Sequence, residues 1–182
     1  CITGHVTFTN LKCLSGNNTL IDFKHCYIKA VNRTHKYISI HINNYVQGVR
    51  NITMNIKVLR FSNGYKPFYI DVTFDTCKYL KKQRNPLVNL IFKAIQPATN
   101  LNHSCPYNVC GKSTCTITFL IIIYVTSVIQ HDLIMDKFWT GNHEVELLKY
   151  LPVPNGDYVL IVTLYIYNSE LLTVHTYLHL TS

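Results

Sequence analysis

The stretch FYIDVTFD, residues 68–75, decides the fold class, because its apolar and polar side chains alternate without a break. A period of two is typical of a β-strand that is buried on one face only. The same alternation recurs in residues 52–58 and 172–180. Weaker strand patterns occupy residues 5–13, 25–31, 35–45, 133–138 and 158–167. The chain is therefore expected to form about eight strands, with turns at Ser62-Asn63-Gly64 and Pro154-Asn155-Gly156.

One segment departs from this period. In NPLVNLIFKAI, residues 85–95, Asn85 suits the N-cap of a helix and Pro86 suits its first position. The apolar residues that follow have helical spacing: Leu87, Val88, Ile91, Phe92 and Ile95. The sequence therefore predicts a mainly β protein, a two-sheet sandwich with one short amphipathic helix at residues 86–96.

The composition is that of a folded domain with a well-buried core. Hydrophobic residues make up 48% of the 182 residues and charged residues only 14%, which excludes a disordered chain. The formal net charge is +8, but lysine and arginine are scattered among apolar residues. The one dense basic cluster, Lys78, Lys81, Lys82 and Arg84, fits a solvated helix entrance. The charge supports only a weak attraction to anionic surfaces, so no nucleic-acid partner is expected.

Four glycosylation sequons and seven cysteines favour the secretory pathway. The acceptor asparagines of these sequons are Asn17, Asn32, Asn51 and Asn102. Residues 1–4, CITG, are interpreted as the remnant of a signal peptide that ends at Gly4. Residues 5–182 are interpreted as a single domain. The expected protein is a secreted, extracellular glycoprotein and a monomer.

Four of the cysteines are expected to form two disulfides. Cys13 ends one predicted strand and Cys26 lies in the next, while Cys77 and Cys105 bracket the predicted helix. Each bridge would stabilise the fold by about 2–4 kcal/mol. The alternative is that these are free, buried thiols, and the sequons make this the weaker interpretation.

Several motifs occur in a fixed order that resembles a known family. They are FTNLKC, CYIKAVNRTHKYISI, LRFSNGYKPFYIDVTFDTCKYL, NHSCPYN and LPVPNGDYVL, and the resemblance covers residues 6–108 and 131–182. The chain resembles an insect family of secreted domains of unknown function that includes the CheB-type chemosensory proteins. That family is similar in turn to the ML lipid-recognition domains, immunoglobulin-like β-sandwiches that hold a lipid between their two sheets. The resemblance implies an ML-like sandwich and an apolar ligand.

The inward-facing apolar rows form the candidate ligand site. From the sequence alone, rows that simply pack against each other at interior density are an equal alternative. The resemblance favours a cavity for a fatty acid, sterol, long-chain hydrocarbon or other lipid, with a role in chemosensation. The expected lining residues are Met54, Ile56, Phe68, Ile70, Val72, Phe74, Ile91 and Phe92. The alternative function is an extracellular interaction protein with a solid core, which modulates a sensory receptor or channel in the membrane.

No catalytic constellation is recognised in the sequence. It contains no G-x-S-x-G, phosphate-loop or H-E-x-x-H motif. Asp71 and Asp75 share a strand face, which fits a solvent-facing edge better than an acid–base pair. His175 and His179 would lie roughly 13 Å apart on one strand, too far to share a metal ion. No enzymatic activity, cofactor or metal is expected.

Residues 109–130 do not fit the family pattern, in which CPYN runs almost directly into a segment like HDLIMDKFW. They include the uncharged run TITFLIIIYVTSVI, which is short for a transmembrane helix and also compatible with a strand pair. Every valine codon begins with GT and a glutamine codon can be CAG, so Val109 and Gln130 match the two ends of an intron. Our hypothesis is that this 22-codon segment is a retained intron translated in frame.

Overall fold

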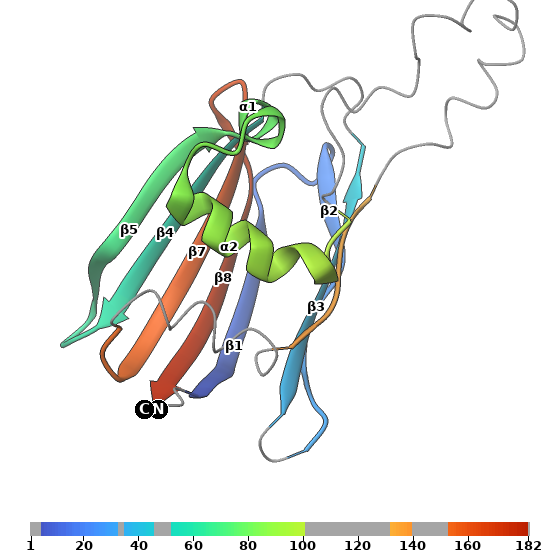
Figure 1. Ribbon diagram of the computed structural model, residues 1–182. Coiled ribbons are helices and arrows are strands. Elements are labelled where there is room, and N and C mark those ends of the chain that lie inside the picture. Colours follow the sequence, from blue (N-terminus) through green and yellow to red (C-terminus); the bar gives the residue numbers. More distant parts are fainter. Residues whose placement is uncertain (1–4, 33–34, 46–51, 101–131, 140–152, 182) are drawn as a thin grey trace, which may run out of the picture.

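The computed structural model describes residues 5–32, 35–45, 52–100, 132–139 and 153–181. These residues form two antiparallel sheets and confirm the predicted β-sandwich (Figure 1). The large sheet has the strand order β1-β8-β7-β4-β5, and the small sheet has the order β2-β3-β6. The strands of the large sheet are β1 (His5–Ser15), β4 (Ile52–Phe61), β5 (Tyr65–Asp75), β7 (Gly156–Ile166) and β8 (Ser169–Thr181). The strands of the small sheet are β2 (Ile21–Ala30), β3 (Lys36–Asn44) and β6 (Leu133–Trp139).

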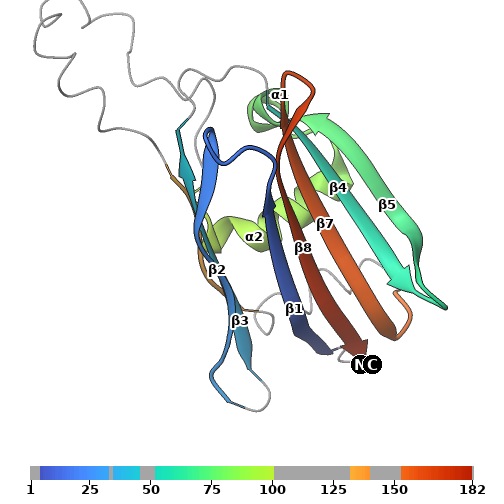
Figure 2. The same ribbon diagram turned by 180° about the vertical axis from the view of Figure 1, so that it is seen from behind.

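The predicted helix is α2 (Pro86–Ile95), and it begins where the sequence indicates. The side chain of Asn85 accepts hydrogen bonds from the backbone N–H groups of Leu87 and Val88, as an N-cap does. Figures 1 and 2 show α2 crossing one face of the large sheet, which we call the inner face. A short 3₁₀ helix, η1 (Gln96–Ala98), follows α2 directly.

A second helix, α1 (Thr76–Lys81), was not predicted from the sequence. It follows β5 without a linker, and the Asp75 carboxylate caps it by accepting from Lys78 N at 2.9 Å. An aspartate three residues before the capped N–H is a recognised helix start, so the signal was present in FDTCK. Among the described residues, no helix is long and apolar enough to span a membrane.

The small sheet covers the inner face only at one end. In both views it lies beside β1, at the opposite end of the large sheet from β5 (Figures 1 and 2). Its Ile21, Ile40 and Ile42 are buried in one cluster with residues of β7 and β8, among them Leu172 and Val174. None of the members of this cluster comes from β5.

A disulfide joins the two sheets at the end where the small sheet covers the inner face. Cys13 on β1 is bonded to Cys26 on β2, with their Cα atoms 6.4 Å apart, which confirms this predicted pair. Because β1 and β2 belong to different sheets, the bond ties one sheet to the other and contributes about 3 kcal/mol. Cys77 is disulfide-bonded as well, and its predicted partner Cys105 lies outside the described residues.

The pairing of β5 with β4 is interrupted by a bulge. Lys57 is paired with Asp71 but Leu59 with Pro67, so β5 carries extra residues at this point. Tyr69 takes the extra length with a φ of 49°, and its side chain is 91% exposed. Phe68 and Ile70 on either side of it remain half-buried.

Candidate ligand-binding site

The predicted lining residues of β4 and β5 lie side by side on the inner face. In the register of these strands Met54 is opposite Phe74, and Ile56 is opposite Val72. Met54 also packs against the core cluster, which places this row on the same side of the sheet as Leu172 and Val174. The structure therefore brings the predicted row together on one surface.

The helix α2 reaches this row through a chain of aromatic rings. Phe74 contacts Tyr79 of α1 with ring centroids 5.3 Å apart, and Tyr79 contacts Phe92 of α2 at 5.6 Å. The Tyr79 hydroxyl donates to Asn89 Oδ1 at 2.6 Å, and burial raises the pKa of this hydroxyl. Ile91, the neighbour of Phe92, is buried. Of the helix residues predicted to line the site, Phe92 is thus connected through Tyr79 to the Phe74 end of the row.

An arginine lies at the other end of the row, and sequence reasoning missed it. The guanidinium of Arg60 is 6.0 Å from the ring of Phe68 and 5.9 Å from the ring of Tyr158. Phe68 and Tyr158 are themselves in edge contact at 5.2 Å. The signal was available, because Arg60 continues the period-two phase of the inward residues 52, 54, 56 and 58.

The row is apolar but not fully covered. Leu172, which faces the small sheet, is 1% exposed, and Ile56 on β4 is 4% exposed. The inward-facing residues of the edge strand β5 are only half-buried: Phe68, Ile70, Val72 and Phe74. The inner face therefore changes from a closed core beneath the small sheet to a partly open apolar surface at β5.

The outer face of the large sheet is polar where the inner face is apolar. A depression of about 480 Å³ is lined there by Thr53, Asn55, Lys57, Asp71, Thr73, Tyr165 and Asn168. Its polar groups bond to each other, with Asn55 donating to Asp71 at 3.0 Å and Lys57 lying 3.0 Å from the same carboxylate. These hydrogen bonds, from Asn55 first and then from Lys57, lower the pKa of Asp71. None of the predicted lining residues contributes to this depression.

Three of the four titratable residues singled out in the sequence, Asp71, Asp75 and His179, have polar partners in the structure. Asp71 pairs with Lys57, and Asp75 caps α1. His179 Nδ1 lies 2.6 Å from Asp157 Oδ1 on the neighbouring strand. Desolvation, followed by the nearby charge of Lys12, lowers the pKa of His175.

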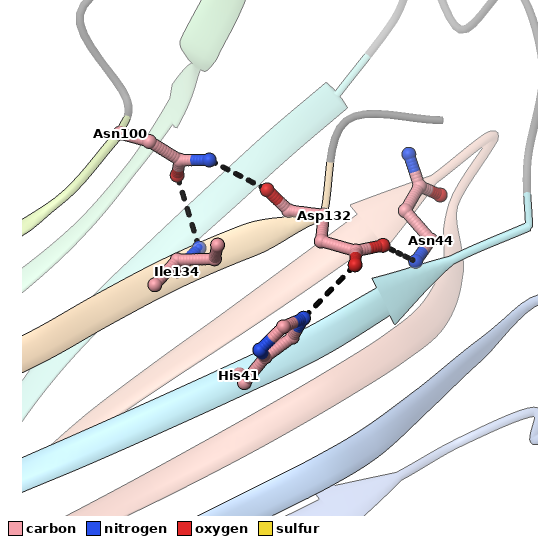
Figure 3. A network of polar contacts seen from close by, with 5 residues as sticks. All are labelled: His41, Asn44, Asn100, Asp132 and Ile134. Carbon is pink, nitrogen blue, oxygen red and sulfur yellow. Dashed lines mark hydrogen bonds and ion pairs between the residues drawn. The ribbon is translucent and has the colours of Figure 1, made fainter. Parts of the chain in front are cut away.

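A polar network ties the start of β6 to its surroundings (Figure 3). Asp132 accepts from Asn44 N and lies 2.9 Å from His41 Nε2 through its carboxylate. The Asn100 side chain donates to the Asp132 carbonyl at 2.6 Å and accepts from Ile134 N at 3.0 Å. A histidine–carboxylate pair can orient a nucleophile, but within the described residues no hydroxyl or thiol bonds to His41. The network acts as a clamp between β3, β6 and the end of η1.

Two of the four acceptor asparagines lie in the described part of the chain. Asn17 is in an exposed turn, where its Oδ1 accepts from both the N–H and the hydroxyl of Thr19. Asn32 is also exposed, in the bend between β2 and β3. Asn51 and Asn102 lie outside the described residues, as do residues 1–4 and 109–130.

Residues 51–116 match the model of a family described as protein of unknown function (DUF1091). The match contains β4, β5, α1 and α2, and therefore Arg60 and all the predicted lining residues. It ends at residue 116, inside the segment 109–130. A search of curated proteins found no significant match to the chain.

Proposed function

We propose that the protein binds an apolar ligand on the inner face, between the β4–β5 end of the large sheet and α2. The observation that carries this proposal is the half-buried apolar row of β5, Phe68, Ile70, Val72 and Phe74. The small sheet packs at the opposite end of the large sheet, so it leaves this row partly uncovered. Covering apolar area with a ligand contributes about 25 cal/mol per Å².

The proposed setting is extracellular. The Cys13–Cys26 bond requires an oxidising compartment to persist, and the side chains of Asn17 and Asn32 are exposed, which supports their use as glycan acceptors. The resemblance to ML-type lipid-recognition domains supports a lipid, fatty acid, sterol or long-chain hydrocarbon as the ligand, and chemosensation as the context. The proposed ligand site uses no metal or cofactor.

Uptake of a neutral fluorescent probe, N-phenyl-1-naphthylamine, tests this function. Wild-type protein is expected to bind the probe with a blue shift and enhanced emission. Val72→Asp should abolish uptake, because it places a charge in the apolar row. Thr73→Asp is the matched control, since Thr73 is the next residue of β5, is exposed on the outer face, and acquires the same charge.

Circular dichroism of both variants separates loss of the site from loss of the fold. If Val72→Asp does not fold, the near-isosteric Val72→Thr replaces it and should weaken probe binding with the fold intact. Wild-type protein that takes up no neutral probe would rule out the proposed function.

A second candidate function is recognition of another protein, such as a sensory receptor or channel. Aromatic side chains are exposed around the β4–β5 hairpin, where Phe61 is 52% and Tyr65 43% exposed and their rings are 5.3 Å apart. Exposed aromatic clusters are common in protein interfaces. Failure of probe uptake would favour this candidate, and Phe61→Ser should then reduce binding to the partner while leaving the fold unchanged.

A further inference from the structure

We infer that the ligand is a long-chain carboxylate whose head group binds to Arg60. This inference rests on the proposed function, because the apolar chain of the ligand would lie along the row that begins at Phe68. It assigns to the ligand a negative head group, which the row alone does not require.

Arg60 is an arginine with unused hydrogen-bonding capacity. Its Nη2 donates to the Asn155 carbonyl at 3.1 Å, while its Nε is buried and has no hydrogen-bond partner within the described residues. The described part of the chain also supplies no carboxylate to this guanidinium. A buried N–H without a partner is costly, and a guanidinium offers a planar pair of donors that matches a carboxylate.

The surroundings hold the guanidinium in place. The guanidinium lies over the buried ring of Tyr158, 5.9 Å from its centroid, and the Tyr158 hydroxyl, which also interacts with Arg60, donates to the Pro154 carbonyl at 2.6 Å. Gly156 leaves room for it, since a Cβ there would already be 3.7 Å from Arg60 Nε, and a longer side chain would compete for the same space. Such a fixed cation loses little side-chain entropy on binding an anion.

Arg60 lies half-buried on the inner face at the start of the apolar row. Lys57 is on the outer face with Asp71, and Lys66, which shares the face of Arg60 because it is opposite Arg60 in the register, is exposed to solvent. From Phe68 to Phe74 the strand extends at most about 20 Å. A positive group at one end of an apolar row of that length fits an amphiphile with one terminal carboxylate better than a neutral hydrocarbon.

Displacement of N-phenyl-1-naphthylamine by matched ligands tests the inference. Palmitic acid, hexadecanol and methyl palmitate have the same chain and differ in the head group. At neutral pH, wild-type protein should bind the acid at least about tenfold more tightly than the alcohol or the ester. Arg60→Gln should weaken acid binding by about tenfold to a hundredfold and leave alcohol binding unchanged within about twofold.

Two further variants sharpen this result. Arg60→Lys keeps the charge but loses the planar fork, so its affinity for the acid should lie between those of wild type and Arg60→Gln. Lys57→Gln is the matched control, because it removes one positive charge from the same strand on the opposite face. Its affinity for the acid should equal that of wild type.

The outcomes distinguish this inference from the proposed function. If the probe binds but wild type binds acid and alcohol equally, the carboxylate inference is wrong and the apolar site stands. If wild type takes up neither probe nor alcohol, the proposed function fails and this inference fails with it. If Arg60→Gln does not fold, the affinities of wild type and of Arg60→Lys for the acid and for the alcohol still test the carboxylate inference. Equal affinities of wild type for the two ligands would show that the inference is wrong.

Discussion

The inner face of the large sheet has two halves that share one sequence pattern and differ in what covers them. Beneath the small sheet, Leu172 is 1% and Val174 9% exposed. At the other end, Val72 and Phe74 are just as apolar and alternate just as regularly, yet they are only half-buried. Alternation thus determines which side of a strand faces inward, while the partner opposite determines whether that side becomes core or binding surface.

The two halves are also fastened differently. The closed half is bonded to the small sheet through Cys13–Cys26 and packs against buried isoleucines of β2 and β3. At the open half, the described contact with α2 runs through Tyr79, which joins Phe74 to Phe92. We therefore expect mutations in the closed half to lower stability, and mutations in the open half to affect binding more than stability.

The largest expected effect is that of Leu172→Ala in the closed half. Removing this fully buried side chain should lower the free energy of unfolding by about 3 kcal/mol, because it leaves a cavity. Ile70→Ala in the open half removes a side chain of the same size that is only half-buried, so it should cost about 1 kcal/mol. Urea denaturation followed by circular dichroism measures both values.

This pair of variants tests whether the two halves really differ. Neutral-probe binding should be weakened by Ile70→Ala and kept by Leu172→Ala wherever that variant is folded. Equal losses of stability at the two positions would show that the β5 row is ordinary core, and would contradict the division of the inner face.

Substitution of two glycines, Gly64 and Gly156, should lower the free energy of unfolding by less than Leu172→Ala does. The pair distinguishes an effect on the backbone from an effect on the ligand site. Gly64 has a φ of 108° with nothing within 4 Å of its Cβ position, and Gly156 has a φ of 145° beside Arg60. Gly64→Val and Gly156→Val should each lower the free energy of unfolding by about 1–2 kcal/mol, because a branched side chain disfavours positive φ. Only Gly156→Val should also weaken palmitic acid binding, since it disturbs the place of Arg60.

Thermal melts and the same displacement titration check this pair. If both variants keep the stability of wild type, the two positions do not need glycine. If Gly64→Val weakens acid binding as much as Gly156→Val, the effect does not come from contact with Arg60.

Much of this fold was predictable because its signals are local. The strand positions, the helix start at Asn85 and the inward row of β4 and β5 follow from spacing within a few residues. The Cys13–Cys26 pair was also predicted, but not that it would join two sheets, since sheet membership depends on contacts between distant segments.

The features that the sequence did not predict have physical reasons of their own. The hairpin between β7 and β8 turns at Tyr167-Asn168, both with positive φ, where no glycine marks the turn. The bulge at Tyr69 appears only when β5 is paired with β4. Arg60 was not predicted to lie inward, because charged residues are normally exposed, although it continues the period-two phase of the inward residues of β4.

The clamp of Figure 3 bears on the segment 109–130, which lies between η1 and β6 in the chain. Asn100 and Asp132 flank residues 101–131, and the Asn100 side chain donates to the Asp132 carbonyl at 2.6 Å. The backbone N–H of Asn100 also donates to the Ile134 carbonyl at 3.2 Å. The two ends of this connection are therefore held together by described residues on either side of it.

Deleting residues 109–130 should consequently have the smallest effect on stability of all these changes. It removes 22 of the 31 residues between Asn100 and Asp132 and leaves Cys105 in place. A shorter connection between ends that are already joined costs less closure entropy, so the free energy of unfolding should stay the same or rise by about 1 kcal/mol. Probe and palmitic acid binding should be unchanged by the deletion. Asn100→Ala, which removes the side-chain bonds of the clamp, should destabilise the full-length chain and the shortened chain alike.

Urea denaturation of the full-length chain and the shortened chain, each with and without Asn100→Ala, measures these effects. Sequencing the mature transcript tests directly whether the 22 codons are a retained intron. A deletion that costs more than about 2 kcal/mol, a loss typical of removing packed core residues, would show that these residues belong to the fold and would overturn the intron hypothesis.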